Sequence, residues 1–370
     1  IFSVCRDILF FPFGRPSHCI APMGLSSQGY NGHIFWDTEL WMFPTLLVLQ
    51  PEMAKSCLDY RSDRLAKAKQ KASIYGYQGA MFPWESDDTG EEATPTWALT
   101  GIFEQHITAD VSIAFWNYFA MTQNQSWLRN EWEVLKQTAN FWVSRAVENA
   151  DGSYSIHNVV GADEYAQHVD DNAFTNASAI ESLKNTIKAA KILNEKVNEE
   201  WIKVSEKLVI HKENGITQNY KGYKGQMIKQ ADVNLLAYPL HIITDKEQIK
   251  KDLEYYADKI DKKDGPAMAS GVLSVLYARL GDRDKAYEYF VKSYLPNSRP
   301  PFGVFSESAN SNNPYFATGA GAMLQAVIYG FGGVEQTDKG LQFNKGILPK
   351  KWKSLKIIGI GTDEKTITVN

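Results

Sequence analysis

The sequence predicts an all-α protein, an (α/α)6 barrel in which two layers of helices alternate along the chain, followed by a short β-rich segment. The chain has 370 residues, of which 44% are hydrophobic and 22% charged, so it can bury a large core. Long segments repeat apolar residues with helical spacing, and loops rich in Gly, Pro and Asn separate them. Patterns that alternate like strands are nearly absent before Gly332.

One class of predicted helix is amphipathic and should form the outer layer. In residues 126–148, apolar side chains recur at steps of three and four behind Ser126, a candidate N-cap, as in Leu128, Trp132, Leu135, Ala139, Trp142 and Ala146. Charged residues occupy the opposite face of residues 245–260 and 283–294. The outer layer is therefore predicted at residues 51–72, 126–148, 196–214, 245–260 and 283–294.

A second class of helix is apolar or small on every side, which is typical of complete burial. Residues 265–280 and 315–330 have this composition. The inner layer is predicted at residues 37–48, 103–123, 172–195, 230–241, 265–280 and 315–330. Because six hairpins need six helices in each layer, we expect one outer helix to lie before Ile1.

From Gly332 onward the pattern changes, and SLKIIGIG and KTITVN are typical of short strands. The sequence therefore predicts two domains: a helical barrel over residues 1–333 and the beginning of a small β-rich domain over residues 334–370.

Composition excludes several classes of partner. The formal net charge is −4 without blocks of Lys or Arg, so we expect neither a nucleic-acid nor a membrane-binding surface. No apolar run is long enough to span a membrane. Cys5, Cys19 and Cys57 lack the spacing of a zinc site and are predicted to be core thiols. Localisation and oligomeric state are left open.

The loops that precede the inner helices should converge at one end of such a barrel. They combine carboxylates with aromatic side chains, as in Trp36 and Asp37, Trp84 and Glu85, Asp163 and Glu164, and Glu307. Indole rings stack on the apolar faces of sugars, and carboxylates bind hydroxyl groups and cleave glycosidic bonds. This mixture indicates a carbohydrate site.

Each of these residues also has a structural interpretation. Asp37 could cap a helix, Asp170 and Asp171 could cap the helix at 172–195, and Lys229 with Gln230 could simply begin a helix. Glu164 and Glu307 could be solvated loop acids. The loop histidines lack the spacing of metal ligands, which favours roles in the core or beside the site and no metal centre; they are His33, His106 and His168.

Four motifs together resemble glycoside hydrolase family 65, and they occur in the family's order. They are GHIFWDTELWMFP, GAMFPWES, the DEY of residues 163–165 followed by DDNAFTN, and IKQADV. The resemblance runs from about residue 20 to the end of the chain. It implies an (α/α)6 barrel that follows a β-sandwich and precedes a small β domain, with the sandwich and the first barrel helix expected before residue 1.

The resemblance also implies roles for single residues. Glu164 would be the general acid that protonates the glycosidic oxygen. Trp36 and Asp37 would hold the glucose that is released, and Lys229 and Gln230 would contact the same sugar. The acceptor sugar would be contacted by Trp84, Glu85 and Thr108.

The family contains inverting hydrolases and inverting phosphorylases, and the loop before the last inner helix distinguishes them. No Lys, Arg or His occurs between Arg299 and Lys339, so this loop is a poor site for a phosphate dianion. Glu307 suits a base that deprotonates water instead. The resemblance thus implies an inverting α-glucosidase without a cofactor, acting on a small α-glucoside, with α-1,2-linked kojibiose or a glucosyl-galactose unit as the expected substrate. Two alternatives stay open: an α-glucoside phosphorylase, and a silent sugar-binding fragment.

Overall fold

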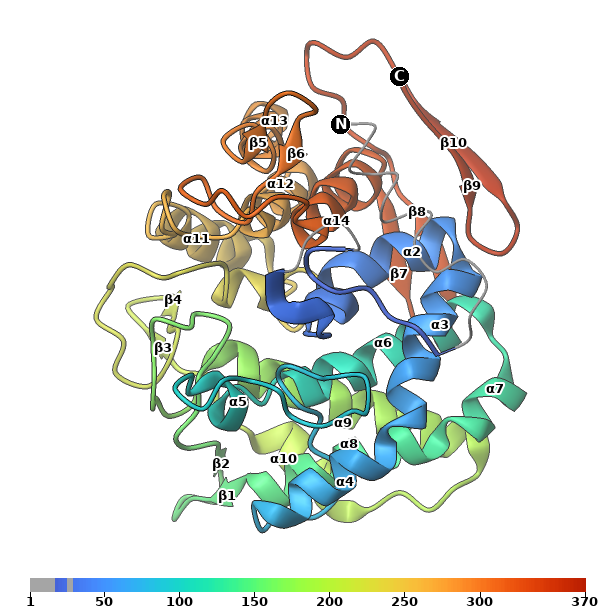
Figure 1. Ribbon diagram of the computed structural model, residues 1–370, viewed down its shortest axis with the longest axis vertical. Helices are drawn as coiled ribbons and strands as arrows, with labels where there is room; N and C mark the ends of the chain where they lie inside the picture. Colours follow the sequence, from blue (N-terminus) through green and yellow to red (C-terminus); the bar gives the residue numbers. More distant parts are fainter. Residues whose placement is uncertain (1–16, 25–28) are drawn as a thin grey trace.

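The computed structural model describes residues 17–24 and 29–370, and these residues are mostly helical, as predicted (Figure 1). The helices in chain order are η1 (Gly29–Gly32), η2 (Asp37–Met42), α2 (Phe43–Leu49), α3 (Pro51–Asp63), α4 (Leu65–Ile74), α5 (Thr100–Phe103), α6 (Ile107–Thr122), α7 (Gln125–Asn130), α8 (Trp132–Arg145), α9 (Ala173–Leu193), α10 (Glu199–Lys207), η3 (Val233–Leu236), α11 (Lys246–Ala257), α12 (Met268–Arg279), α13 (Arg283–Lys292), α14 (Ala317–Gln325) and η4 (Ala326–Phe331).

The two predicted helix classes occupy different environments. Most side chains of α6, α9, α12 and α14 are buried, whereas α8, α10, α11 and α13 bury one face only. Among the buried elements, η2 packs against α6 and α14, and α6 packs against α9. In turn, η3 packs against α9 and α12, and α12 packs against α14. Apolar composition thus distinguished these buried helices from the amphipathic ones correctly.

One predicted inner helix is wrong. Residues 230–241 form only the four-residue 3-10 helix η3. Pro239 lies inside the predicted range, and a proline lacks the N–H of a helix and disfavours helical backbone at the residue before it. The segment is buried, as its apolar pattern predicts, but it is not a full helix.

Several boundaries also differ from the predictions. The predicted helix at 103–123 begins only at Ile107, and the helix at 196–214 ends at Lys207. A hairpin of β3 (Lys212–Glu213) and β4 (Ile216–Thr217) follows, joined by Asn214 and Gly215, which both have positive φ. Asn-Gly is the preferred pair for a two-residue hairpin turn, so these two residues form a hairpin instead of continuing the predicted helix.

The helix caps correct three predictions. Asn124, not Ser126, caps α7 and accepts a hydrogen bond from the Trp127 N–H, and Glu131 separates α7 from α8. Asn172 caps α9 and accepts from the Thr175 N–H, so neither Asp170 nor Asp171 does. Asp171 instead accepts from the backbone of Ile156.

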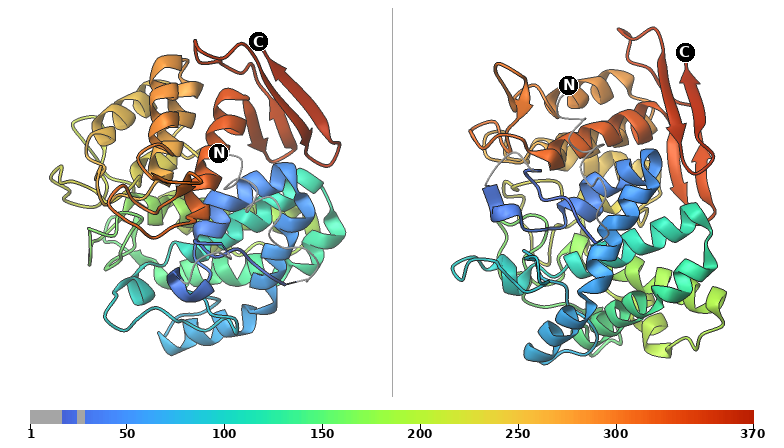
Figure 2. Two further views of the ribbon diagram at one scale, coloured as in Figure 1. Left: turned by 45° about the horizontal axis from the view of Figure 1, so that its top comes forward. Right: turned by 45° about the vertical axis from the view of Figure 1, so that its right-hand side comes forward.

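The C-terminal strands form as predicted. β9 (Leu355–Ile360) pairs with β10 (Lys365–Val369), and β7 (Val334–Thr337) pairs with β8 (Gly340–Phe343), both antiparallel. The right-hand view of Figure 2 shows these strands on one side of the molecule and the long loops on the opposite side. Short pairs elsewhere are β1 (Val147–Glu148) with β2 (Tyr154–Ser155) and β5 (Ser298–Arg299) with β6 (Val304–Phe305).

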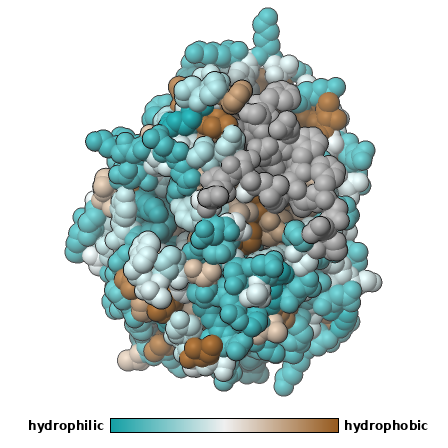
Figure 3. All heavy atoms as spheres, in the orientation of Figure 1, coloured by the Kyte–Doolittle hydropathy of each residue, from teal (hydrophilic) through white to brown (hydrophobic). Residues whose placement is uncertain are grey.

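Cys19 and Cys57 are buried thiols, as predicted, while Cys5 lies outside the described residues. The face drawn in Figure 3 is largely hydrophilic, with scattered apolar side chains. Within residues 17–24 and 29–370, no helix is both long and apolar enough to cross a membrane.

Candidate active site

Seven of the nine residues predicted for the site line one cavity, together with Tyr30. The cavity lies where the inner elements begin: Asp37 opens η2, Met268 opens α12, and Phe316 precedes α14. Helix N-termini carry partial positive charge, which favours carboxylates at this end of the helices. The lining residues are Pro22, Tyr30, Phe35, Trp36, Asp37, Trp84, Glu164, Lys229, Gln230, Pro266, Met268, Glu307 and Phe316.

Asp37 is held by the last inner helix of the chain. Its side chain is buried, and the Thr318 hydroxyl donates a 2.6 Å hydrogen bond to Asp37 Oδ1. Burial raises the pKa of Asp37 to about 7; the Thr318 bond opposes this increase, and the charges of Glu307 and Glu164 add to it. Asp37 is not the N-cap of η2, because it is the first residue of that helix and Trp36 occupies the N-cap position.

Trp84 is positioned by a loop with a carboxylate at its centre. Glu92 accepts hydrogen bonds from the backbone N–H groups of Trp84 at 2.9 Å and Glu85 at 3.0 Å, and pairs with Lys71. The segment is also tied to the first loop, because Ile34 and Ser86 exchange backbone hydrogen bonds. Trp84 and Trp36 consequently lie with ring centroids 6.2 Å apart and form an aromatic wall.

Glu164 is half-buried and paired with a cation. Lys229 Nζ lies 2.8 Å from Glu164 Oε1, and Gln230 Nε2 lies 3.5 Å from the same oxygen. Beneath them, Asp163 accepts from the Lys229 N–H at 2.8 Å and from Asn219 at 2.9 Å. These buried bonds fix the backbone on both sides of the Glu164–Lys229 pair.

Asp163 is supported in turn by a second buried acid. Asp232 accepts from the Asp163 N–H and from Asn172, the cap of α9. Burial raises the pKa of Asp163 to about 6 and that of Asp232 to about 7, while hydrogen bonds partly oppose both shifts.

Glu307 reaches the cavity from the loop before α14. Its backbone carbonyl accepts from the Ala267 N–H at 2.9 Å and from Asn297 at 3.1 Å, and Arg299 binds three carbonyls of the same loop. The Tyr30 hydroxyl donates a 2.7 Å hydrogen bond to Glu307 Oε1. Nothing in the sequence distinguished Tyr30 from other loop tyrosines, because its partner Glu307 is 277 positions further along the chain.

Two of the predicted site residues, Glu85 and Thr108, do not line the cavity but support the residues that do. Glu85 is buried and lies 2.7 Å from His33 Nδ1, which opposes the increase that burial causes in the pKa of Glu85. The fully buried Thr108 hydroxyl accepts from the Phe82 N–H at 3.0 Å and so supports the loop that presents Trp84. No group of three His, Cys, Asp or Glu residues in the described chain is arranged to hold a metal ion.

The cavity therefore combines an aromatic wall, three carboxylates and one lysine. Such a site can stack a sugar ring, bind its hydroxyls, and offer two carboxyl groups for proton transfer.

Comparison with known proteins places the chain in a family. Residues 12–226 and 216–297 match the pattern described as "Glycosyl hydrolase family 65 central catalytic domain". The chain belongs to glycoside hydrolase family 65.

Its relatives within this family include hydrolases. A "Kojibiose hydrolase" from Flavobacterium johnsoniae is 52% identical over 371 residues, which cover 98% of this chain and 54% of the relative. A "Protein-glucosylgalactosylhydroxylysine glucosidase" from Dictyostelium discoideum is 38% identical over 95% of this chain and 52% of its own length. The family 65 chain thus spans about half the length of the curated relatives it matches.

The fold has a counterpart among solved structures. One named "Putative kojibiose phosphorylase from human microbiome" superimposes with a TM-score of 0.80 over 95% of this chain and 57% of its own, at 21% sequence identity. The mostly helical architecture is therefore that of the family's catalytic domain.

Proposed function

We propose that this family 65 chain is the catalytic part of an inverting α-glucosidase that releases glucose from a small α-1,2-linked glucoside such as kojibiose. The observation that carries the proposal is that Glu164 and Glu307 line one cavity with the sugar-binding candidates Trp36, Asp37, Lys229 and Gln230. The names and high identity of the kojibiose hydrolases add support for the substrate.

In the proposed reaction, Glu164 donates its proton to the glycosidic oxygen while the bond from that oxygen to the anomeric carbon breaks. Glu307 takes a proton from a water molecule, whose oxygen bonds to the anomeric carbon from the opposite face. The α-linked glucose therefore leaves as β-glucose. Tyr30 aligns Glu307 through its hydrogen bond.

Lys229 has a role that changes when sugar binds. Its Nζ lies 2.8 Å from Glu164 Oε1, the carboxyl group that must reach the glycosidic oxygen in the proposed reaction. We infer that a hydroxyl group of the bound sugar replaces Glu164 as the partner of Lys229, which leaves the Glu164 carboxyl group free to face the glycosidic oxygen. Trp84 would border the acceptor sugar, with Glu85 and Thr108 positioning its loop.

We also propose that the inner elements close into the (α/α)6 barrel of residues 1–333, with η3 in place of one full helix, and that residues 334–370 begin a β-rich domain. The pairwise packing of η2, α6, α9, η3, α12 and α14, in which each element contacts two others, supports this arrangement.

A product assay tests the function. Incubation with kojibiose should release glucose at the same rate with and without inorganic phosphate, and NMR of the first product should detect the β-anomer. Phosphate-dependent formation of glucose 1-phosphate would identify a phosphorylase instead. Sugar binding without any product would identify a silent binding protein.

Carboxyl-to-amide variants test the assigned roles. Glu164→Gln and Glu307→Gln should each lower kcat on kojibiose by about 100-fold or more, because general acid–base groups typically contribute about 10²–10⁴-fold. Glu213→Gln is the matched control, since Glu213 is exposed on β3. Full activity in either site variant would remove that residue from the mechanism.

A further inference from the structure

A buried histidine lies directly behind the aromatic wall of the cavity. His106 is fully buried, and its two flanking acids, Glu104 and Asp110, are 2% and 1% exposed. Nδ1 of His106 lies 2.7 Å from Asp110 Oδ2, and Nε2 lies 3.1 Å from Glu104 Oε1. Both ring nitrogens are therefore engaged by carboxyl groups.

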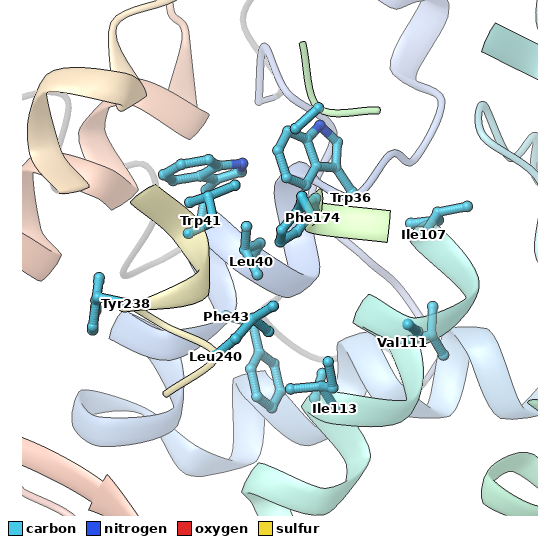
Figure 4. Packing of buried hydrophobic residues seen from close by; sticks show 14 of the residues in the cluster. Trp36, Leu40, Trp41, Phe43, Ile107, Val111, Ile113, Phe174, Tyr238 and Leu240 are labelled. Atoms are coloured by element: carbon cyan, nitrogen blue, oxygen red, sulfur yellow. The ribbon is translucent and has the colours of Figure 1, made fainter. Parts of the chain in front are cut away.

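The remaining surface of the imidazole contacts three aromatic rings. Its centroid lies 4.7 Å from that of Trp36 and 5.5 Å from that of Trp84, both in T-shaped contact, and 4.8 Å from Phe174. Figure 4 shows Trp36 beside Phe174, near the start of α6 at Ile107. Since Trp36 and Trp84 line the cavity, one ring supports both halves of the wall.

The two carboxyl groups favour a charged ring. Although burial alone lowers it, the pKa of His106 is raised to about 10, chiefly by Asp110 and also by Glu104. Burial raises the pKa values of Glu104 and Asp110. One ionised and one neutral carboxyl group around an imidazolium would leave the cluster without net charge. Charged groups outside the cluster that act on it, or on which it acts, include Glu39, Arg61, Glu164, Lys229 and Asp232.

We propose that His106, clamped between Asp110 and Glu104, is a positioning residue that fixes the indoles of Trp36 and Trp84 for sugar binding, and that it does so as a cation. A cation over the face of an indole and within about 6 Å of its centroid is attracted to the ring. The centroid of His106 lies within that distance of both indoles, in T-shaped contact with each. The inference rests on the proposed function, because it assigns the wall to a sugar.

A merely structural cluster would stabilise the fold without affecting the sugar, so the test needs a matched control. Asp252 is a comparable buried acid, 3% exposed, that accepts from Thr217 and Gln248 and does not line the cavity. Asp252→Asn should lower thermal stability and leave sugar binding unchanged. Asp110→Asn and Glu104→Gln keep the shape of the cluster and remove one acid each.

The experiment first measures the protonation of His106 and then the affinity of the protein for glucose. Nitrogen-15 NMR of the wild-type protein at pH 8.5, with His106→Gln for assignment, should detect both ring nitrogens protonated. Calorimetry with glucose should then give a Kd that rises about tenfold in Asp110→Asn, which corresponds to the loss of two cation–π contacts, and less in Glu104→Gln. The KM for kojibiose should rise more than kcat falls.

Each outcome has a distinct meaning. A neutral His106 at pH 8.5 would overturn the inference, and the NMR measurement requires no variant to fold except for assignment. Unchanged glucose affinity in Asp110→Asn, with a loss of stability like that of Asp252→Asn, would reduce the cluster to a structural role. A wild-type protein that binds no glucose would overturn the proposed function itself, and with it this role for His106.

Discussion

Tyr30 is the single residue that contributes most to the site without a sequence signal. Its ring packs edge-on against Phe35 at 5.2 Å, and its hydroxyl donates to Glu307. Burial and nearby acids raise the pKa of Tyr30, so the phenol stays protonated and remains a donor at neutral pH. A permanent donor restricts the orientation of the proposed base.

The variant Tyr30→Phe should lower kcat on kojibiose by roughly tenfold to a hundredfold, because Glu307 loses its fixed orientation. KM should change little, since the ring and its packing remain. Tyr75→Phe is the control, because Tyr75 is exposed and lies outside the cavity. A kcat equal to that of wild type would show that Glu307 is held by its loop alone.

Asp37 should make stability depend on pH in an unusual direction. Its pKa is raised from 3.8 to about 7, so between these values the folded state holds a proton that the unfolded state has lost. The free energy of unfolding therefore decreases as pH rises through this window. Asp163 and Asp232, whose pKa values are also raised, contribute with the same sign.

Asp37→Asn should accordingly be more stable than wild type at pH 8, by on the order of a few kcal/mol, and gain little at pH 4. Urea unfolding at both pH values measures the difference. Sugar affinity should fall in the same variant, because the amide loses the carboxylate's charge. Asp88→Asn, at an exposed position, should follow wild type at both pH values. Equal gains at both pH values would contradict the protonation mechanism.

At the scale of the element, the residue that caps α9 also holds part of the candidate active site. Its cap, Asn172, accepts from the Thr175 N–H at 2.8 Å and donates to Asp232 at 2.9 Å. A Cβ at Gly161 would come within 2.2 Å of the Asn172 side chain, so this position requires glycine. The start of one helix thus positions the segment that carries Glu164.

A pair of cap variants tests this connection. Asn198 caps α10 and accepts from the Glu200 N–H at 3.0 Å, at an exposed position away from the cavity. Asn198→Ala should cost about 1 kcal/mol of unfolding free energy and leave kcat/KM unchanged. Asn172→Ala should cost more, because it also removes one of the two hydrogen bonds that the buried Asp232 accepts, and should lower kcat/KM. If the two variants affected activity equally, the cap of α9 would have no specific role in positioning the site.

At the scale of the whole molecule, the C-terminal hairpins and the cavity occupy different regions. Asp338, in the turn between β7 and β8, accepts from Trp116 Nε1 at 2.9 Å and pairs with Lys188 at 2.9 Å. Those partners belong to α6 and α9, beyond the ends that border the cavity. The hairpins are therefore attached at a distance from the proposed chemistry.

Asp338→Ala should loosen this attachment and increase limited proteolysis within residues 334–370, since both side-chain contacts disappear. The kcat/KM for kojibiose should stay close to that of wild type. Asp363→Ala, which removes an exposed pair with Lys365 on the second hairpin, is the control for proteolysis. A large loss of activity in Asp338→Ala would mean that the hairpins support the cavity.

The sequence alone determined the helical class, the division into buried and amphipathic helices, the C-terminal strands and most of the cavity residues. The spacing of apolar residues is a property of a short stretch of sequence and does not depend on how the helices pack, so α8 and α12 could be predicted directly. The loop motifs likewise pointed to Trp36, Asp37, Glu164 and Glu307, which the structure brings into one cavity.

Only the tertiary structure decided which partners those residues meet. Tyr30 with Glu307, Thr318 with Asp37, and His106 with both indoles are contacts between segments far apart in the chain. The structure also shows that Thr108 supports the loop of Trp84 and does not line the cavity, and that residues 230–241 contain only the short helix η3. The spacing of residues along the chain determines which of them share a face of a helix. The distances between loops, however, depend on how all the helices pack. The pKa values of the buried acids depend on their burial, which the composition does not give.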